Sequence, residues 1–486
     1  MSATLARILV FASSAAVLLL EILAGRLVAP YVGVTLETFT GIIGIVLLGI
    51  ALGAVAGGRA ADRFEPRPLL GPLLILGGLS SMASPTIVNL VGPSVKAGGP
   101  VEIVVLTLSA FFVPALALSA IPPIVVKLRL RSLEETGTVV GSLSALGTVG
   151  ALVGTFVTGF VLVAAAPTRP LVLTSGAVLI AGGVLISAGV GTRQARVLAL
   201  LAALAAAIGL GFADDPCEFE TTYFCAVIEV DAERPTGRTL WLDALPHSYV
   251  DLVDPTYLRM RYAGIVADVV EESYSSALSA AYIGGGGFTL PRYFAAIRPD
   301  SRATVLEIDG ALVRLVDREL GLELSNTLRV EVGDARLRLP RHGDGSFNLV
   351  VGDAFGGLSV PWHLTTREFL TEIDRVLTDD GVYVVNLIDY PPLGFARAEV
   401  ATFRAVFPNV AVIAPPRLLS GEQGGNFVIV GSQGTVPWER IQERLERRPN
   451  SAVVWSGRFA EEFAGESKTL TDDFAPVDQL LSHPPR

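Results

Sequence analysis

The stretch AYIGGGGFTLPRYFAAIRPDSRATVLEID, residues 281–309, has the pattern of a nucleotide-binding βαβ unit. An apolar run leads into four glycines, a helical segment follows, and a second apolar run ends on acidic residues. Glycines let the backbone turn sharply and approach a ligand closely, because no Cβ obstructs it. The acid about twenty residues further on stands where such folds bind ribose hydroxyl groups. The predicted nucleoside-binding residues are Gly284, Gly285, Gly286, Gly287, Glu307 and Asp309.

Composition divides the chain into two unlike halves. Its 486 residues exceed one ordinary domain, and its mean hydropathy of +0.55 is too high for a wholly soluble protein. Up to Phe212 there are 12 basic and 7 acidic residues, which leaves 25 basic and 40 acidic residues after it. An acidic soluble half argues against nucleic acid as a partner and would tolerate cationic substrates such as amines, or its acids merely solvate the surface.

The first half predicts a helical transmembrane domain over residues 1–213. Its apolar runs approach the twenty residues that cross about 30 Å of hydrocarbon, and the first is too long for a cleaved signal peptide. Small residues in 141–154 should allow close helix packing. We expect Pro114, Pro122 and Pro123 to bend or break the fourth run. The seven predicted spans are 6–29, 38–60, 69–91, 102–126, 138–165, 171–190 and 196–212.

Two charges, Glu21 and Arg26, fall within the first predicted span. An unpaired charge there is costly, so the two indicate either a structural pair near the interface or part of a polar pathway. Residues 57–63, read as a loop, resemble the charged loop between the second and third helices of major facilitator transporters. Seven spans are fewer than the twelve of that family.

Basic residues near the span ends predict the orientation. The even-numbered loops hold most of them, which places these loops and the N-terminus in the cytoplasm and the soluble half outside a cell membrane. Cys217 and Cys225, the only cysteines, follow the last predicted span. A disulfide there fits an oxidising compartment; the alternative is a pair of free thiols in a β-hairpin. Without a histidine nearby, we expect no metal.

The second half predicts a small β domain over residues 214–262 and a Rossmann-like α/β domain over residues 263–486. Short apolar runs flank a turn at 235–237, and a helix is expected over 255–274. Strands then alternate with helices, which is typical of a mostly parallel sheet that binds its ligand at the carboxyl ends of the strands. The expected strands are 278–283, 303–309, 327–332, 347–353, 381–388, 409–414 and 426–431.

Three successive motifs make the likeness to a known family specific. The glycine run with Glu307-Ile-Asp309, then Val332-Gly-Asp-Ala335, then Leu349-Val-Val-Gly-Asp-Ala354 resemble the class I methyltransferase fold and, within it, the spermidine synthase (polyamine aminopropyltransferase) family. With the helical half, the chain resembles bacterial membrane-fused spermidine-synthase-like proteins. Segments 242–249 and 470–477 are similar to further segments of that family.

The resemblance assigns roles at both ends of the site. Glu307 would bind both ribose hydroxyl groups, and Asp334 with the amide of Ala335 would contact adenine. Asp353 would accept the proton of the attacking amine, and Tyr390 would lie near that amine. Asp243, Tyr262 and Asp473 are candidates for substrate contact. His247, at the position of the family's glutamine, is a substitute ligand, a base or a structural residue.

Two family acids are replaced by glycine in this sequence. Gly287 stands where the family has the aspartate that holds the donor's amino group, and Gly356 stands where it has a polyamine-binding acid. Each lost charged hydrogen bond is worth about 1.5–3 kcal/mol. Asp243, Asp472 and Asp473 could restore negative charge at the pocket, or Thr471 to Asp473 could cap a short helix.

Three functions follow from these observations. The first is a membrane-integral transferase that moves an aminopropyl group from decarboxylated S-adenosylmethionine, or a related adenosyl sulfonium, to a small amine or polyamine. The second is an S-adenosylmethionine-dependent methyltransferase. The third is a transporter or nucleoside sensor with a regulatory soluble domain. The lipid bilayer is the expected surrounding, and a homo-oligomer is left open.

Overall fold

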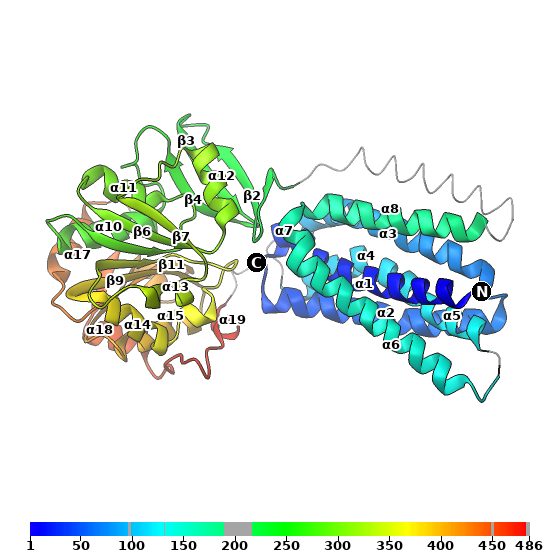
Figure 1. Cartoon of the computed structure of the whole chain (residues 1–486). Coiled ribbons are helices and arrows are strands. Elements are labelled where there is room, and N and C mark those ends of the chain that lie inside the picture. Colours follow the sequence, from blue (N-terminus) through cyan, green and yellow to red (C-terminus); the bar gives the residue numbers. More distant parts are fainter. Residues whose placement is uncertain (96–98, 131, 189–215, 449–451, 483–486) are drawn as a thin grey trace. The chain divides into compact units, whose positions relative to one another are not determined.

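The computed structural model describes residues 1–95, 99–130, 132–188, 216–448 and 452–482. The chain divides into two compact units, Met1–Ala226 and Val227–Arg486. The first unit is helical and the second is built on β-sheets (Figure 1).

Long apolar helices form the first unit. Within the described ranges, six helical segments are long and apolar enough to cross a membrane, and they coincide with the first six predicted spans. The seventh predicted span, 196–212, lies outside the described residues. The helices are α1 (Ala3–Val32), α2 (Leu36–Arg63), α3 (Leu70–Val91), α4 (Pro100–Ser119), α5 (Ile121–Arg129), α6 (Thr136–Val157), α7 (Val163–Ala165) and α8 (Thr168–Ala188), with short turns η1 (Arg67–Leu69), η2 (Gly92–Val95) and the π-helical η3 (Thr158–Leu162) between them.

Proline interrupts the fourth span, as the sequence predicted. Pro114 lies inside α4, and the helix stops at Ala120 before resuming as α5. Pro122 and Pro123 follow directly, where their missing N–H groups need no partner in a first turn. The segment from α4 to α5 still counts as one candidate span, Pro100–Arg129.

Small residues bring α6 close to α1. A Cβ on Gly150 would lie 2.4 Å from the carbonyl oxygen of Phe11, and one on Gly154 would lie 2.3 Å from that of Ala15. Larger side chains would therefore push the two helices apart. This is the close packing that the glycine-rich sequence indicated.

Two predictions about charged residues in this unit are wrong. Residues 57–63 are not a loop but the last turns of α2, because Arg59, Ala60 and Ala61 favour a helix and no proline interrupts the chain before Pro66. The predicted pair of Glu21 with Arg26 is also wrong, because Arg26 pairs with Glu220, with Nη2 and Oε1 2.7 Å apart; the alternative of a polar pathway stays a prediction.

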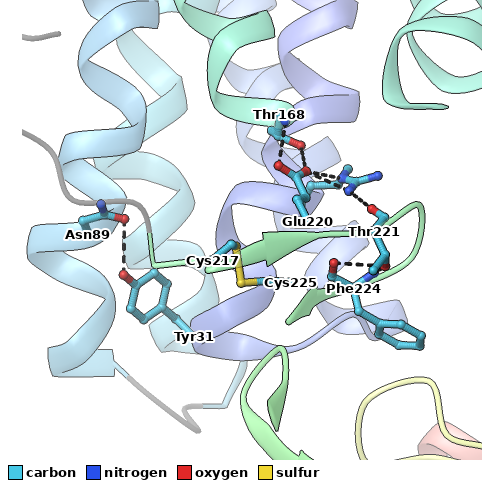
Figure 2. Close-up of a disulfide and its surroundings, with 9 residues drawn as sticks. Tyr31, Asn89, Thr168, Cys217, Glu220, Thr221, Phe224 and Cys225 are labelled. Carbon is cyan, nitrogen blue, oxygen red and sulfur yellow. Dashed lines mark hydrogen bonds and ion pairs between the residues drawn. A yellow bond between two sulfur atoms is a disulfide. The ribbon is translucent and has the colours of Figure 1, made fainter. Parts of the chain in front are cut away.

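The segment from Cys217 to Cys225 is held by a disulfide and by polar contacts to the helices (Figure 2). The Cα atoms of the two cysteines are 5.1 Å apart. Arg26 Nη1 donates to the carbonyl oxygen of Thr222 at 2.8 Å, and the backbone N–H of Thr168 donates to Glu220 Oε2 at 2.8 Å. Glu220 therefore links the N-terminus of α8 to α1.

A four-stranded sheet, in the order β1-β2-β3-β4, precedes the α/β fold. Strands β3 and β4 pair antiparallel around a two-residue turn at Asp243 and Ala244, with a bulge between Leu240 and Trp241. Its strands are β1 (Phe219–Glu220), β2 (Cys225–Val230), β3 (Gly237–Leu242) and β4 (Leu245–Asp251).

An eight-stranded sheet in the order β12-β10-β11-β9-β8-β5-β6-β7 forms the centre of the second unit (Figure 1). Strands β5 to β9 run parallel, and β11 pairs antiparallel with both β9 and β10. The sequence predicted every strand except β12. The strands are β5 (Ser279–Ile283), β6 (Arg302–Glu307), β7 (Leu328–Val332), β8 (Phe347–Gly352), β9 (Leu377–Asp389), β10 (Asn409–Ala414), β11 (Gly425–Ser432) and β12 (Val453–Ser456).

Helices cover this sheet and bury its apolar strands. The predicted start of the first helix at Pro255 is wrong, because Asp254 to Tyr257 form a turn in which the Asp254 side chain accepts from the N–H of Thr256. The helices and turns are α10 (Arg261–Ser273), α11 (Thr289–Ile297), α12 (Gly310–Leu320), α13 (Ala335–Arg338), η4 (Leu339–Arg341), η5 (Trp362–Leu364), α14 (Arg367–Val376), α15 (Gly394–Arg404), α16 (Pro416–Leu419), α17 (Trp438–Glu446), α18 (Arg458–Ala464) and α19 (Val477–Leu480).

Candidate functional site

The glycine loop begins where β5 ends, at the carboxyl edge of the parallel strands. Gly284 has a φ of +89°, and a Cβ there would lie 2.5 Å from the carbonyl oxygen of Asp353, at the end of the neighbouring strand β8. Gly286 also has a positive φ, of +49°. Only glycine meets both demands, positive φ and close approach of two backbones. The loop therefore lies directly against the residue predicted to be the base.

Glu307 ties the glycine loop to the end of β6. Its Oε2 accepts from the N–H of Gly285 at 2.7 Å, and its Oε1 accepts from the N–H of Asp309 at 2.9 Å. The side chain is buried, and desolvation raises the pKa of its carboxyl group. A carboxylate offers about four lone-pair sites, and the backbone N–H of Gly286 also lies near this one, so part of its accepting capacity remains for hydroxyl groups. These contacts are compatible with the predicted ribose role.

Asp309 and Asp334 both cap helices. Asp309 Oδ1 accepts from the N–H groups of Ala311 and Leu312 at the start of α12, and its Oδ2 is buried without a hydrogen-bond partner among the described residues. Asp334 Oδ1 accepts from the N–H of Arg336 at 2.8 Å and so begins α13. N-capping thus accounts for both acids locally. Any contact of Asp309 with a nucleoside stays a prediction.

The predicted adenine end has a neighbour that the sequence did not indicate. His363, in η5, places Nε2 3.1 Å from Asp334 Oδ2. Ala335, the first residue of α13, is buried beside it. His363 therefore restrains the carboxylate of Asp334 next to Ala335, the other residue predicted to contact adenine.

Asp353 follows β8 directly and is held by two neutral hydrogen-bond donors. Tyr262 Oη in α10 donates to Asp353 Oδ2 at 2.9 Å, and Asn386 Nδ2 in β9 donates to Asp353 Oδ1 at 2.9 Å. Asn426 Nδ2 in β11 donates in turn to Asn386 Oδ1 at 3.0 Å. Desolvation raises the pKa of Asp353 to about 6, and the two hydrogen bonds oppose that rise. A base near this pKa operates well close to neutral pH.

Tyr390 and His247 occupy different surroundings. Tyr390 follows β9 and packs on Gly424, where a Cβ would lie 2.1 Å from its ring. His247 lies in β4 with its ring centroid 6.1 Å from that of Phe355. Desolvation lowers the pKa of His247 to about 4, so its imidazole is neutral near pH 7. This neutrality argues against a cationic role for His247.

Ser248 meets the loop at the position where an acid is replaced. Its Oγ accepts from the N–H of Gly287 at 2.9 Å, and a Cβ on Gly287 would lie 2.9 Å from the Cβ of Ser248. The serine therefore occupies space that a side chain at residue 287 would need. No pattern in the sequence singled out Ser248.

Neither acid of the C-terminal motif caps a helix. Thr471 and Phe474 exchange backbone hydrogen bonds and close a two-residue turn, so the capping interpretation is wrong. Asp472 Oδ1 accepts from Thr366 Oγ1 at 2.7 Å, and Asp472 also pairs with Arg336. Asp473 is exposed on the turn. Asp243 lies in the turn between β3 and β4 with a φ of +53°.

A small cavity of about 20 Å³ joins several of these groups. It lies between the glycine loop, the end of β8 and the start of α10, so Asp353 and Tyr262 face it together with Ser248. In the described part of the chain, no cluster of three or more His, Cys, Asp or Glu side chains could hold a metal ion. The residues of its lining are Ser248, Tyr262, Tyr282, Gly284, Gly285, Thr289, Leu290, Pro291, Val351 and Asp353.

A parallel sheet with a glycine loop after its first strand and acids after the next three defines a methyltransferase-like α/β fold. Known proteins agree. The chain is 29% identical over 239 residues to the polyamine aminopropyltransferase of Vibrio vulnificus, which covers 46% of this chain and 75% of the relative. It is 28% identical over 445 residues to polyamine aminopropyltransferase 2 of Streptomyces coelicolor, which covers 83% and 77%.

Comparison with solved structures also finds a spermidine synthase. The crystal structure of a probable spermidine synthase from Corynebacterium glutamicum superposes with a TM-score of 0.50 at 28% identity, over 54% of this chain and 99% of that one. No protein-family profile matches the chain. The homologues of this protein are thus polyamine aminopropyltransferases and spermidine synthases, and they support a transferase of this type.

Proposed function

We propose that this protein transfers an aminopropyl group from decarboxylated S-adenosylmethionine, or a related adenosyl sulfonium, to an amine. The observation that carries the proposal is the position of Asp353. This acid has a pKa of about 6, is oriented by Tyr262 and Asn386, and lies against the glycine loop that Glu307 holds. The two relatives reported above are named polyamine aminopropyltransferases, which supports this reaction type.

The reaction needs one base and accurate positioning. The lone pair of the amine attacks the aminopropyl carbon attached to the sulfonium, the carbon–sulfur bond breaks, and its electron pair stays on sulfur as methylthioadenosine leaves. The proton released from the amine passes to Asp353. Tyr262 and Asn386 both donate to this carboxylate and so fix the direction in which its oxygens face.

The donor's nucleoside is assigned to the neighbouring strand ends. Glu307 would accept hydrogen bonds from both ribose hydroxyl groups, since a carboxylate can accept two hydrogen bonds from a diol. Asp334 and the N–H of Ala335 would contact adenine, and the glycine loop would pass beneath the sulfonium. Tyr390 would lie beside the acceptor amine.

S-adenosylmethionine-dependent methyl transfer is the second candidate. The contact between Ser248 and Gly287 favours it, because no carboxylate stands at residue 287 to select a donor with a free aminopropyl end. With no acid at residue 287, the site would not repel the carboxylate of S-adenosylmethionine. The two reactions leave different nucleosides, so their products separate them.

We further propose that the protein is a multi-pass protein of the cell membrane with its soluble unit outside. Six apolar helices of sufficient length support the first part. The second part also requires the seventh predicted span, 196–212, which lies outside the described residues. The bias of basic residues toward the even-numbered loops and the disulfide between Cys217 and Cys225 support it. A transporter or sensor role for the helices, with the soluble unit as a regulator, is compatible with the same arrangement.

Product analysis tests the reaction. The full chain, purified in detergent, is incubated with each donor and a mixture of amines, and the released nucleoside is identified by mass spectrometry. Methylthioadenosine is the expected product; S-adenosylhomocysteine would establish methyl transfer instead. Calorimetry with both donors and with methylthioadenosine accompanies it, and binding no tighter than millimolar for all three would overturn the nucleoside site.

A further inference from the structure

A second, larger cavity shares Tyr262 with the small one, and neither Asp353 nor any residue assigned to the donor lines it. It has a volume of about 700 Å³ and lies between the start of α10, the segment before β11 and α17. Its polar lining among the described residues consists of Arg259, Arg261, Arg448, Tyr262, Gln423 and Asn426, and no described residue of the lining is acidic. A dication would therefore meet positive charge on entering it.

Two contacts connect this cavity with the proposed base. Tyr262 lines both cavities and donates to Asp353 Oδ2 at 2.9 Å. Asn426 lines the larger cavity and donates to Asn386, which donates to Asp353 Oδ1. The larger cavity is thus the space from which an acceptor would approach the carboxylate.

The three arginines differ in how far their charge is already compensated. Arg259 pairs with Asp231, and Arg448 donates two hydrogen bonds to Asp268. Arg261 is exposed and forms no ion pair with a described residue. Its charge is therefore the one most available to a ligand in the cavity.

The N-terminus of α10 adds to this positive potential. Arg261 is the first residue of this 13-residue helix, and the preceding Met260 provides no side-chain hydrogen bond to the first turn. Unsatisfied N–H groups and the helix dipole favour an anion at such an end. Met260, Arg261 and Tyr262 all line the cavity. The anion-binding end and the guanidinium groups therefore face the same space.

From this arrangement we propose that the acceptor is an amine that also carries an anionic group, a carboxylate or a phosphate. Its amine would reach Asp353, and its anionic group would lie at Arg261 and the start of α10. This inference rests on the proposed aminopropyl transfer and names its acceptor class. It also gives a physical reason for a glycine at residue 356, because such an acceptor has no second ammonium group for an acid to bind.

Four acceptor amines of similar length test whether the site prefers an anionic group at the far end of the acceptor. Methylthioadenosine release is measured with 1,4-diaminobutane, n-butylamine, 4-aminobutanoate and 3-aminopropylphosphonate, which differ mainly in the group at the far end. We expect kcat/KM for one or both anionic acceptors to exceed that for the diamine by about tenfold or more, the effect of one charged hydrogen bond. A preference for the diamine would overturn the inference and leave aminopropyl transfer intact.

Substitution of Arg261 tests whether this residue causes the preference for an anionic acceptor. Arg261→Gln should lower the ratio of kcat/KM for the preferred anionic acceptor to that for n-butylamine by about tenfold. Arg458→Gln, at a side chain that is 86% exposed on α18 and pairs with Glu462, is the matched control and should leave the ratio unchanged. Equal ratios in the wild type and in Arg261→Gln would contradict the assignment.

Binding gives a readout that does not depend on turnover. Calorimetry of the full chain with 4-aminobutanoate and 3-aminopropylphosphonate, in the presence of methylthioadenosine, should show binding that Arg261→Gln weakens. If no acceptor releases methylthioadenosine but this binding is seen, the reaction is wrong and the anionic pocket stands. If neither compound binds, the pocket assignment is wrong.

Discussion

Ser248 fills the space beside Gly287, with its Cβ 2.9 Å from where a Cβ of residue 287 would lie. Because real side chains do not approach so closely, the serine and an acid at residue 287 exclude each other in this backbone. We expect Gly287→Asp alone to impair donor binding. The double variant Gly287→Asp/Ser248→Gly should bind decarboxylated S-adenosylmethionine about tenfold more tightly than the wild type, measured by calorimetry.

Ser248→Gly alone is the control for this prediction and should show no gain. An improvement from Gly287→Asp without the second substitution would mean that Ser248 is not the obstacle.

Asp353→Asn should abolish turnover while nucleoside binding persists. An asparagine can still meet Asn386 and Tyr262 but cannot accept the amine proton, so kcat should fall by about 10²–10⁴-fold. Methylthioadenosine release measures kcat, and calorimetry measures donor affinity. Asp300→Asn, at an exposed position, serves as the control. Unchanged turnover in Asp353→Asn would remove the base assignment.

The pH profile should reflect the raised pKa of Asp353, about 6. The carboxylate is the active form, so kcat should fall about tenfold per unit as the pH drops below 6 and level off above it. If kcat instead begins to fall only near pH 4, the usual pKa range of an aspartate, desolvation does not raise the pKa of Asp353.

Stability offers an independent check on the same group. The folded state binds the proton of Asp353 more tightly than the unfolded chain does, because its pKa is raised. The favourable contribution is therefore complete below the ordinary pKa of 3.8 and lost as the pH rises through 6. The Tm of the wild type relative to Asp353→Asn should decrease over this interval.

Glu307→Gln should weaken nucleoside binding by about 10–100-fold, since it removes a charge-assisted acceptor. The amide nitrogen would also face the N–H of Gly285 or Asp309, which now donate to the carboxylate. Calorimetry with methylthioadenosine and its 2′,3′-dideoxy analogue separates the two effects. If the ribose role holds, removing the hydroxyl groups costs the wild type much more affinity than it costs the variant.

The side of the membrane can be tested with a single engineered thiol. In a Cys217→Ser/Cys225→Ser background, Asp300→Cys places one reactive cysteine on an exposed position of the soluble unit. We expect a membrane-impermeant maleimide to label it in intact cells. Labelling only after lysis would place the soluble unit in the cytoplasm.

The sequence predicted the parts of the site that local patterns determine. Four adjacent glycines and acids at strand ends are visible without a structure, because turn geometry and strand alternation have short-range signals. Asn386 and Asn426 lie within apolar strands, so they look like isolated polar residues until β9 and β11 pair. Asn386 contacts Asp353 from 33 positions further along the chain, and Asn426 contacts Asn386 from 40 positions beyond it, so neither contact has a local signal.

The errors have physical causes of the same kind. Polar residues at 57–63 marked the end of an apolar run, but a helix continues beyond hydrocarbon as long as its residues permit. Glu21 was the nearest acid to Arg26 in sequence, whereas Glu220 reaches it across the fold. The acids at Asp472 and Asp473 matched a capping pattern that a tight turn also satisfies.

The pairing of Arg26 with Glu220 has a consequence for dissecting the protein. A helical fragment that ends before residue 216 would lose every partner of the Arg26 side chain recorded in the described chain, namely Glu220, Thr221 and Thr222. With those partners in place only 18% of the Arg26 side chain is exposed, so the fragment would carry a guanidinium in α1 that has lost its ion pair and its hydrogen bonds. Autonomous expression of the helices therefore calls for a C-terminal boundary no earlier than Ala226, where the compact unit ends.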